Sequence, residues 1–417
     1  MMKSLDGISA WINQKRLRDY PRLMLIATWL ILALNILFRN GWQGGLGQII
    51  GGDFIVLYSA GLLYRENPSS IYDYDQQALS QQTLVSPTVL PGLNPYISPP
   101  YVASAYSLLT PLPLPWAFLL WTAAMIAFAF ISVKLLMGLL PAEIKAKGVS
   151  TSYLMILVLS FFPFIESLQA GQNSGLTLLL TTCVLYFYFK ERYFLAGISA
   201  GLMIYKPQYV LGFLILWLVW KNIKSLAGFT LVALVWIGSF YLANGIELFI
   251  AYQNLTQTLV LLPYFEGFPA YILVTLYGLL STILPQSAQP YTYGLTQVVL
   301  LGGLLALAYY AFRIRHKPVI ERIPAITLAI LLPLLATPYV LLHDLVILIP
   351  VFVVLARYNP HRELLLTVIV IYFGAFFLTL LSALSHIALN ALSVIGLVIM
   401  IIWWLARGLP QPTGTVV

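Results

Sequence analysis

Long apolar runs recur along nearly the whole chain, and no other feature limits its fold so strongly. A membrane-spanning helix needs about 20 consecutive apolar residues. Of the 417 residues, 60% are hydrophobic and 9% are charged, whereas a soluble domain carries about 25% charged residues. The sequence therefore predicts an all-α polytopic membrane protein. We expect residues 1–417 to form a single integral membrane domain, a helical bundle with about 10–12 transmembrane helices.

Twelve segments are apolar enough to be candidate spans: 22–38, 116–138, 151–168, 174–189, 193–205, 207–220, 225–243, 294–312, 323–337, 340–356, 364–382 and 388–406. Each half of 193–220 has about 13 residues and would be about 20 Å long as a helix. That length is short for a 30 Å core, so this stretch could also be a re-entrant hairpin with Lys206–Pro207 at its tip.

The basic residues predict the orientation. If the N-terminus is cytoplasmic and the spans alternate, the cytoplasmic loops collect 19 of the 22 lysines and arginines, all except Arg39, Arg65 and Lys206. Cytoplasmic loops carry such an excess. We therefore expect a multi-pass protein of the cell membrane, surrounded by membrane lipids. The net charge of +8 belongs to these loops and does not indicate a nucleic-acid partner. The first run has no small-residue cleavage site, so we interpret it as a retained span.

Two long segments, 39–115 and 244–293, are then extracytoplasmic. The first is rich in Gly, Pro and Tyr, and we expect it to contain interfacial helices. In the second, residues 246–262 and 270–284 are apolar and helical in pattern. A single crossing would place the basic 313–322 loop outside, so we expect two short helices in the interface. A pair of true spans would also preserve the orientation.

Asp53 is the first candidate for chemistry. It lies in GGDFIVLYSAG, directly after the first span. One interpretation is a helix N-cap for residues 54–64. The other is a general base, because a partly desolvated carboxylate can accept a proton from a sugar hydroxyl. The two roles are compatible.

Lys206 and the His343–Asp344 pair are the next candidates. A lysine within a membrane segment indicates a functional site, and beside a proline break its ammonium could hold a phosphate. The alternative is that it snorkels to the surface. His343 and Asp344 follow a helix break at Thr337-Pro338-Tyr339. They could bind phosphate or orient a carboxylate, or simply close a helix end.

Other polar or aromatic residues have weaker signals. Asp73-Tyr74-Asp75 spells a D-x-D, but a turn and helix cap before Gln76 is the favoured interpretation, and we predict no metal site and no cofactor. Glu166 and residues 169–173 form a polar tip that is either a plain loop or part of a pocket. Candidates to contact a sugar ring or an isoprenoid chain are Tyr58, Tyr96 and Tyr101, although tyrosine is common at membrane interfaces.

Four segments in order resemble glycosyltransferase family 87, of the GT-C superfamily. They are GGDFIVLYSAGLLYRENPSSIYDY, NPYISPPYVASAYSLLTPLPLPWAFLLW, the run from AGQNSGLTLLL to MIYKPQYVLGFLILWL, and ATPYVLLHDLVILIPVF. The resemblance covers about residues 50–356. The family's polar tip matches Gly171, Gln172 and Asn173. Its Lys-Pro matches Lys206–Pro207, and its late polar pair matches His343–Asp344.

The resemblance implies a GT-C-type bundle with an extracytoplasmic active site. It implies transfer of a hexose, usually mannose, from a polyprenyl-phosphate donor to an acceptor hydroxyl of a glycolipid or glycan. The position that matches the superfamily's catalytic base is Asp53. Lys206 and His343 would neutralise the leaving phosphate, and Tyr58, Tyr96, Tyr101, Gln172, Asn173 and Asp344 would contact substrate. From a β-linked donor, a single displacement would invert the linkage.

Two other interpretations stay open at this point. Twelve spans and a buried charge also fit a transporter or lipid flippase. Against it, the polar groups cluster at one face and no internal repeat is visible. A structural membrane subunit without chemistry is the third interpretation, in which Asp53, Lys206 and His343 could all be changed without effect.

Overall fold

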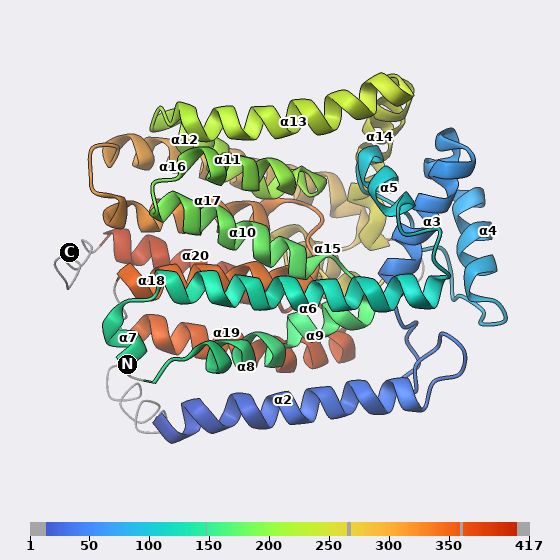
Figure 1. The fold of residues 1–417 in the computed structure, drawn as a ribbon, viewed down its shortest axis with the longest axis horizontal. Helices are drawn as coiled ribbons and strands as arrows, with labels where there is room; N and C mark the ends of the chain where they lie inside the picture. Colours follow the sequence, from blue (N-terminus) through green and yellow to red (C-terminus); the bar gives the residue numbers. More distant parts are fainter. Residues whose placement is uncertain (1–13, 147, 265–267, 359–361, 407–417) are drawn as a thin grey trace.

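The structure, a computed structural model, describes residues 14–406 except 147, 265–267 and 359–361. Within these residues it is built of helices, with three isolated β-bridges and no strand. Long helices run side by side along the long axis, and shorter helices gather at one end of the bundle (Figure 1). The predicted all-α polytopic fold is confirmed.

Six helical segments are long and apolar enough to cross a membrane. They correspond to α2 (Gln14–Leu37), α6 (Leu114–Leu139), α13 (Ile223–Asn244), α16 (Gln289–Arg313), α17 (Ile323–Ala336) and α19 (Arg362–Ser385). Their side chains toward the outside are mostly apolar and exposed, as lipid contact requires, whereas α17 is buried along its whole length. Helices α12 (Leu211–Val219), α16 and α20 (Ala391–Ala406) pack around α17.

The remaining predicted spans are shorter or broken. Residues 151–168 form two helices, α8 (Thr151–Ser160) and α9 (Phe162–Ala170), which bend by 63° at Phe161. Five further apolar segments are shorter than 18 residues. They contain α10 (Ser174–Phe189), α11 (Tyr193–Gly201), α12, α18 (Leu348–Tyr358) and α20. The number of true crossings, expected to be 10–12, stays a prediction.

The stretch 193–220 has two short arms. Helix α11 continues into a 3-10 turn, Leu202–Tyr205, and a second 3-10 turn, Pro207–Val210, leads into α12. Lys206 is the residue between the two turns. Proline removes a backbone donor and restricts the residue before it, which is why the helix breaks here. The tip of this pair is where the sequence analysis expected it.

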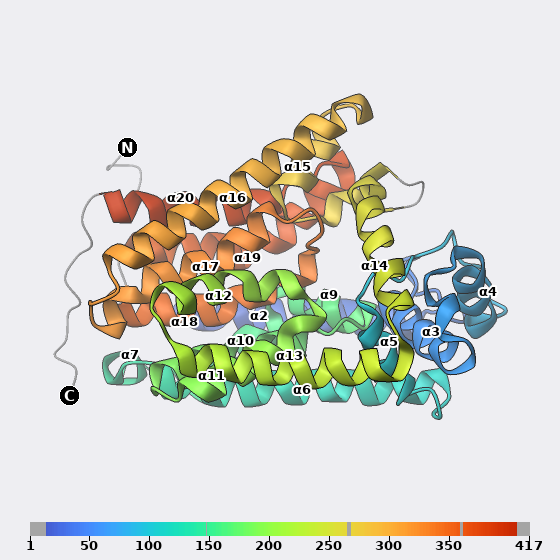
Figure 2. The same ribbon diagram turned by 90° about the horizontal axis from the view of Figure 1, so that it is seen from above.

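Both long segments between spans fold into short helices at the same end of the bundle. The first contains α3 (Gly52–Glu66), α4 (Tyr74–Val85) and α5 (Pro100–Ser107). The second contains α14 (Glu247–Thr258) and α15 (Leu276–Ile283), neither of which is long enough to be a candidate span. Figure 2 shows α14 standing across the ends of the long helices.

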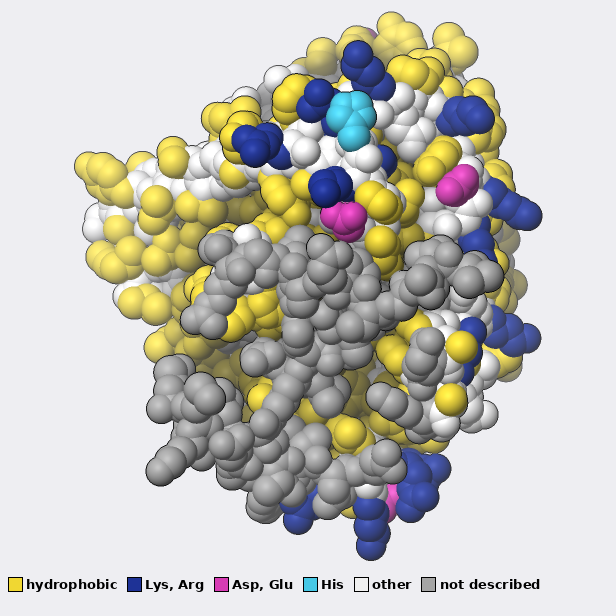
Figure 3. Space-filling model, turned by 90° about the vertical axis from the view of Figure 1, so that its left-hand side faces the viewer, with side chains coloured by type: hydrophobic (Ala, Val, Ile, Leu, Met, Phe, Trp, Pro, Cys, Tyr) yellow, Lys and Arg dark blue, Asp and Glu magenta, His cyan; other side chains and the backbone are white. Residues whose placement is uncertain are grey.

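The opposite end holds the two ends of the described chain, Gln14 and Ala406, and is basic. Figure 3 looks onto this end, and lysines and arginines outnumber acidic side chains on the part that is coloured. Basic residues lie in the short turns between helices, including Lys190, Lys221 and Arg315, and Arg313 ends α16. The short helices and the basic turns therefore lie at opposite ends, as the charge pattern predicts.

Candidate functional site

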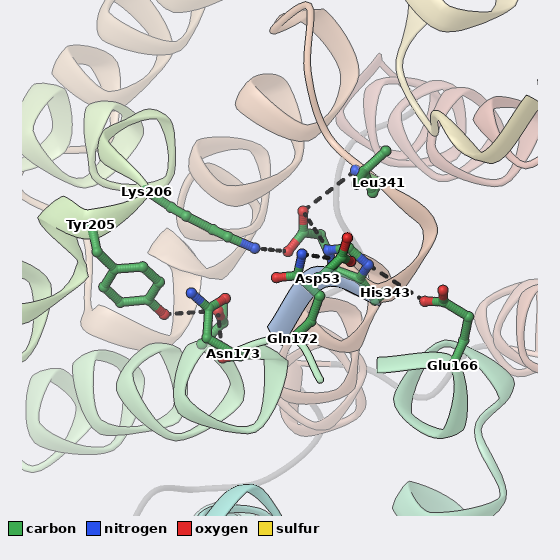
Figure 4. A network of polar contacts seen from close by, with 10 residues as sticks. Asp53, Glu166, Gln172, Asn173, Tyr205, Lys206, Leu341 and His343 are labelled. Atoms are coloured by element: carbon green, nitrogen blue, oxygen red, sulfur yellow. Dashed lines mark hydrogen bonds and ion pairs between the residues drawn. The ribbon is translucent and has the colours of Figure 1, made fainter. Parts of the chain in front are cut away.

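A polar cavity lies at the end of the bundle that carries the short helices. Its volume is about 370 Å³. Its wall combines α3, the Pro-rich loop 94–99, the turn before α10, the tip at Lys206, α14 and the break after α17. The polar groups in it come from segments far apart in the sequence: Asp53, Asn94, Gln172, Asn173, Lys206, His343 and Asp344. Figure 4 shows most of them pointing toward one another.

Asp53 lies in the first turn of α3, where the helix dipole favours a carboxylate. The helix is capped by Gly51, with a φ of 69°, and no side chain caps it. The interpretation of Asp53 as the N-cap for residues 54–64 is therefore wrong. Its carboxylate instead accepts hydrogen bonds from two side-chain amides, Asn94 Nδ2 at 3.0 Å and Gln172 Nε2 at 2.8 Å. A carboxylate has about four acceptor positions, so both oxygens can accept further bonds from the cavity.

The turn between α9 and α10 fixes Gln172. Gly171 ends α9 with a φ of 75°, and a Cβ there would lie 2.5 Å from the Cβ of Phe54. The Gly51 N–H donates to the Gln169 carbonyl at 2.8 Å, and the Trp121 indole donates to the Gly171 carbonyl at 3.1 Å. Only glycine fits this backbone and this space. The start of α3 and this turn are thus joined as one unit.

Lys206 is paired inside the cavity. Its ammonium lies 2.5 Å from Asp344 Oδ1, and the two side chains are 16% and 5% exposed. A buried carboxylate needs such a partner, so snorkelling does not describe Lys206. An ammonium has three N–H donors, and the pair with Asp344 uses one of them. Lys206 thus keeps donors for an anion in the cavity.

His343 is buried between two carboxylates. Its Nδ1 lies 3.4 Å from Glu166 Oε2, and its Nε2 lies 3.8 Å from Asp344 Oδ2. Glu166 comes from α9, just before the turn that holds Gln172. The sequence analysis left Glu166 as part of a loop or a pocket. Its acidic side chain in an otherwise apolar segment was the available signal.

The tyrosines divide into two groups. Tyr58 and Tyr101 are buried and do not line the cavity; their hydroxyls donate to backbone carbonyls of Leu112 and Ile204. Tyr96 lines the cavity, but its hydroxyl donates to the Pro99 carbonyl. The structure places three other tyrosines in the wall, which the sequence analysis did not select: Tyr205, Tyr252 and Tyr339.

The cavity tyrosines stay neutral. Burial raises the pKa of Tyr252 to about 12. Burial also raises the pKa of Tyr339, and the nearby carboxylates of Asp53 and Asp344 raise it further. Phenols that do not ionise can donate hydrogen bonds to a ligand but do not serve as bases near neutral pH.

Asp73, the first residue of the D-x-D sequence, is the N-cap of α4. The Asp73 carboxylate accepts from the backbone N–H groups of Asp75 and Gln76 at 2.9 and 3.0 Å and begins α4. The favoured interpretation of this sequence as a helix cap is confirmed. Among the residues that the structure describes, no group of three or more His, Cys, Asp or Glu side chains is arranged to hold a metal ion.

Comparison with known families now decides between the three interpretations. The model of glycosyltransferase family 87 matches residues 96–338, more than half of the chain. The chain belongs to glycosyltransferase family 87. It is a membrane glycosyltransferase, which favours the enzyme interpretation over a transporter or a structural subunit. No curated protein matches the chain.

The family 87 match contains part of the cavity wall. It includes Gln172, Asn173 and Lys206, whereas Asp53 lies before it and His343 and Asp344 lie after it. In the fold, residues outside the matched range contact residues inside it. Gln172 donates a hydrogen bond to Asp53, and Lys206 forms an ion pair with Asp344. The cavity is therefore the candidate active site of this family 87 enzyme.

Proposed function

We propose that the protein transfers a hexose, mannose in the first instance, from a polyprenyl-phosphate carrier to an acceptor hydroxyl, with Asp53 as the general base. The observation that carries the proposal is the position of Asp53. Its carboxylate lies at the cavity wall, is fixed by two amides, and lies in one cavity with the Lys206 ammonium.

The proposed reaction is a single displacement at the anomeric carbon. The acceptor oxygen forms a bond to this carbon while the bond from the carbon to the phosphate oxygen breaks. The proton of the acceptor hydroxyl passes to Asp53, and polyprenyl phosphate leaves with the electron pair of the broken bond. A β-linked donor gives an α-linked product. A positioned base of this kind contributes about 10²- to 10⁴-fold to the rate.

The leaving phosphate needs positive charge and hydrogen-bond donors. Lys206 supplies an ammonium, and His343 supplies an imidazole that Glu166 and Asp344 flank. Such preorganised donors act strongly in a site that excludes water. Asp344 holds Lys206 in place before the donor binds. Gln172, Asn173 and Tyr96 line the cavity and would contact the substrate.

The arrangement of the bundle supports an extracytoplasmic active site in the cell membrane. The cavity lies at the end opposite the basic turns and the termini, and basic turns favour the cytoplasm. An activated sugar used on that side would come on a lipid carrier, and its acceptor would be a glycolipid or glycan exposed there. Segments 39–115 and 244–293 would then be the extracytoplasmic parts of one membrane domain.

A direct test uses the purified protein in nanodiscs with radiolabelled polyprenyl-phosphate-mannose and a membrane lipid extract. We expect label to move into a new product with the wild-type protein and not with Asp53→Asn. Carriers with other sugars are compared in the same assay. Equal transfer by both proteins would refute the assignment of Asp53 as the general base. Absence of transfer from every carrier would refute the proposal that the sugar donor is lipid-linked.

A further inference from the structure

A groove runs along the outside of the bundle between α2 and α19. Its volume is about 650 Å³, and it shares no lining residue with the polar cavity. The lining residues recur every three or four positions within 16–31 of α2 and within 366–377 of α19. Each wall is therefore one face of a helix. Apart from Arg16, Tyr20 and Thr28, the walls carry only hydrocarbon or thioether side chains. We call this space the α2–α19 groove.

Hydrogen bonds hold one wall of the groove, α2, against α8. Pro21 lies inside α2 and has no N–H to donate to the Leu17 carbonyl, four residues earlier. The Tyr153 hydroxyl of α8 donates to this carbonyl instead, at 2.8 Å. Further along α2, the Trp29 indole donates to the Leu159 carbonyl at 2.9 Å. Two directed contacts therefore fix the position of α2 on the side of α8.

A separate set of contacts holds the other wall, α19. The Tyr372 hydroxyl shares a hydrogen bond with the Ser160 hydroxyl at the end of α8. The Tyr372 ring stacks on Phe161, at the break between α8 and α9, with the ring centroids 5.5 Å apart. Since α2 and α19 are each tied to α8 by contacts of their own, the space between them is a fixed feature of the fold. The rings of Tyr20 and Phe373 meet across it, with centroids 6.3 Å apart.

The groove is at least as long as one leaflet of a bilayer is deep. Residues 20–31 of α2 and 366–377 of α19 each extend about 16 Å along their helix, at 1.5 Å per residue. The hydrocarbon core of a bilayer is about 30 Å thick, so the chains of one leaflet extend about 15 Å. Both helices are candidate spans and run along the long axis of the bundle (Figure 1). Leu23 on one wall and Val370 on the other are 61% and 67% exposed, so the groove is open to lipid.

The groove begins at a positively charged part of α2. Arg16 lines the groove about one turn before Tyr20, on the same face of the helix. Residues 14–22 carry four basic side chains and one acidic side chain, a net charge of +3. A guanidinium binds phosphate through two parallel N–H groups. Basic residues beside a span also attract anionic lipids, by about fivefold in affinity for each residue.

We infer that the α2–α19 groove binds an anionic glycerophospholipid of the leaflet at the basic end of the bundle. One acyl chain lies along the apolar walls, and the phosphate of the headgroup lies at Arg16. The bound lipid fills the space between α2 and α19 and so stabilises the bundle. The inference goes beyond the proposed function and uses no residue of the polar cavity, so either proposal can fail without the other.

The first test maps the lipid directly. Phosphatidylglycerol with a photoreactive diazirine in one acyl chain is irradiated with the wild-type protein in nanodiscs, and the labelled peptides are sequenced. We expect label within residues 20–31 and 366–377, well above the label on the exposed faces of α6 and α13. Even label over all these helices would overturn the inference. Loss of the label when polyprenyl phosphate is added at equal concentration would assign the groove to that lipid instead and would also overturn it.

The second test fills the groove. A lipid that binds the folded protein raises its unfolding temperature, so the wild-type protein should unfold at a higher temperature in phosphatidylglycerol nanodiscs than in phosphatidylcholine nanodiscs. Ala27→Trp places an indole in the groove and should remove most of this difference. Ala127→Trp is the matched control, because Ala127 is exposed on α6 and does not line the groove. The same difference in both variants would overturn the inference.

The third test concerns the headgroup. Native mass spectrometry of the full chain measures how much phosphatidylglycerol stays bound. Arg16→Gln should lower the affinity by about fivefold, whereas Arg16→Lys should retain most of it. Arg18→Gln makes the same change of charge at an exposed residue that does not line the groove, and it should have a smaller effect. Equal losses in Arg16→Gln and Arg18→Gln would overturn the position of the phosphate. Spectra of two chains without bound lipid would place a second copy in the groove and overturn the inference.

Discussion

The two ends of the bundle differ in whether their charged side chains are exposed or buried. At the end with the termini, lysines and arginines lie exposed in short turns, and the ion pair of Lys317 with Glu321 is 58% and 35% exposed. Such surface pairs contribute about 0–1 kcal/mol. At the other end, Lys206, Asp344 and His343 are held inside the protein, each within reach of an opposite or ionisable partner. One end keeps its charges in exposed turns, and the other holds them around a cavity.

The backbone explains this difference. A regular membrane helix satisfies all its own backbone groups and leaves no polar group to offer. The cavity end has breaks at Gly51, Gly171, Lys206–Pro207 and Thr337–Pro338, and every break contributes to the cavity wall or positions a residue in it. The end with the termini keeps its turns at the surface. Irregular backbone inside a membrane bundle is tolerated where it lines a cavity.

Replacing Asp53 should have the largest effect. Asp53→Asn keeps the shape of the side chain but removes the base, so kcat should fall by about 10²- to 10⁴-fold, with the thermal unfolding temperature nearly unchanged. Steady-state transfer and a thermal unfolding scan in detergent measure both. Glu66→Gln, at the far end of the same helix and exposed, is the matched control. A kcat for Asp53→Asn within a few-fold of wild type would refute the assignment.

Breaking the ion pair should mainly reduce stability. Lys206→Met leaves the Asp344 carboxylate buried without its cation, which costs about 3–5 kcal/mol. The double variant Lys206→Met/Asp344→Asn should recover most of the unfolding temperature. It should not recover the donor KM, because the ammonium that we propose to bind the donor phosphate is still missing. An exposed pair offers the comparison: Lys317→Met should change stability by less than about 1 kcal/mol.

If the double variant recovered both the unfolding temperature and the donor KM, Lys206 would serve only as the partner of Asp344. A normal donor KM in the single variant would have the same meaning.

Glu166 should have a smaller effect that acts through His343. Removing the carboxylate in Glu166→Ala should lower kcat by about tenfold, or about 1.4 kcal/mol, because the His343 imidazole loses the carboxylate that lies 3.4 Å from its Nδ1. Glu166→Gln keeps an acceptor oxygen and should retain most of the activity. In the double variant His343→Ala/Glu166→Ala, loss of Glu166 should add nothing further. Additive losses in kcat would show that Glu166 acts independently of the histidine.

The sequence predicted the bundle more fully than the site. Apolar runs of span length and basic turns are local patterns, so the helices and the two ends follow from them. Asp53, Lys206 and His343 stood out because each is an ionisable group in an apolar setting. Their pairing could not be predicted, since Asp344 meets Lys206 across 138 positions of the chain. The same holds for the tyrosines, because only the fold decides whether a side chain lines the cavity, as Tyr96 does, or lies away from it, as Tyr58 and Tyr101 do.

The smallest effect is expected for the acidic pair that most resembles a metal motif. Asp73 caps α4 through two backbone N–H groups, so Asp73→Ala should lower the free energy of unfolding by about 1 kcal/mol and leave kcat unchanged. Transfer should also continue in EDTA, because in the proposed reaction the protein's own cations neutralise the leaving phosphate. Titrating EDTA into the wild-type assay, with Mn²⁺ added back, measures this. EDTA could abolish activity, and Mn²⁺ could then restore it in the wild-type protein but not in Asp73→Ala. This outcome would mean that a metal ion, and not Lys206, neutralises the charge of the leaving phosphate. It would also end the contrast between Asp73 as a helix cap and Asp53 as the proposed base.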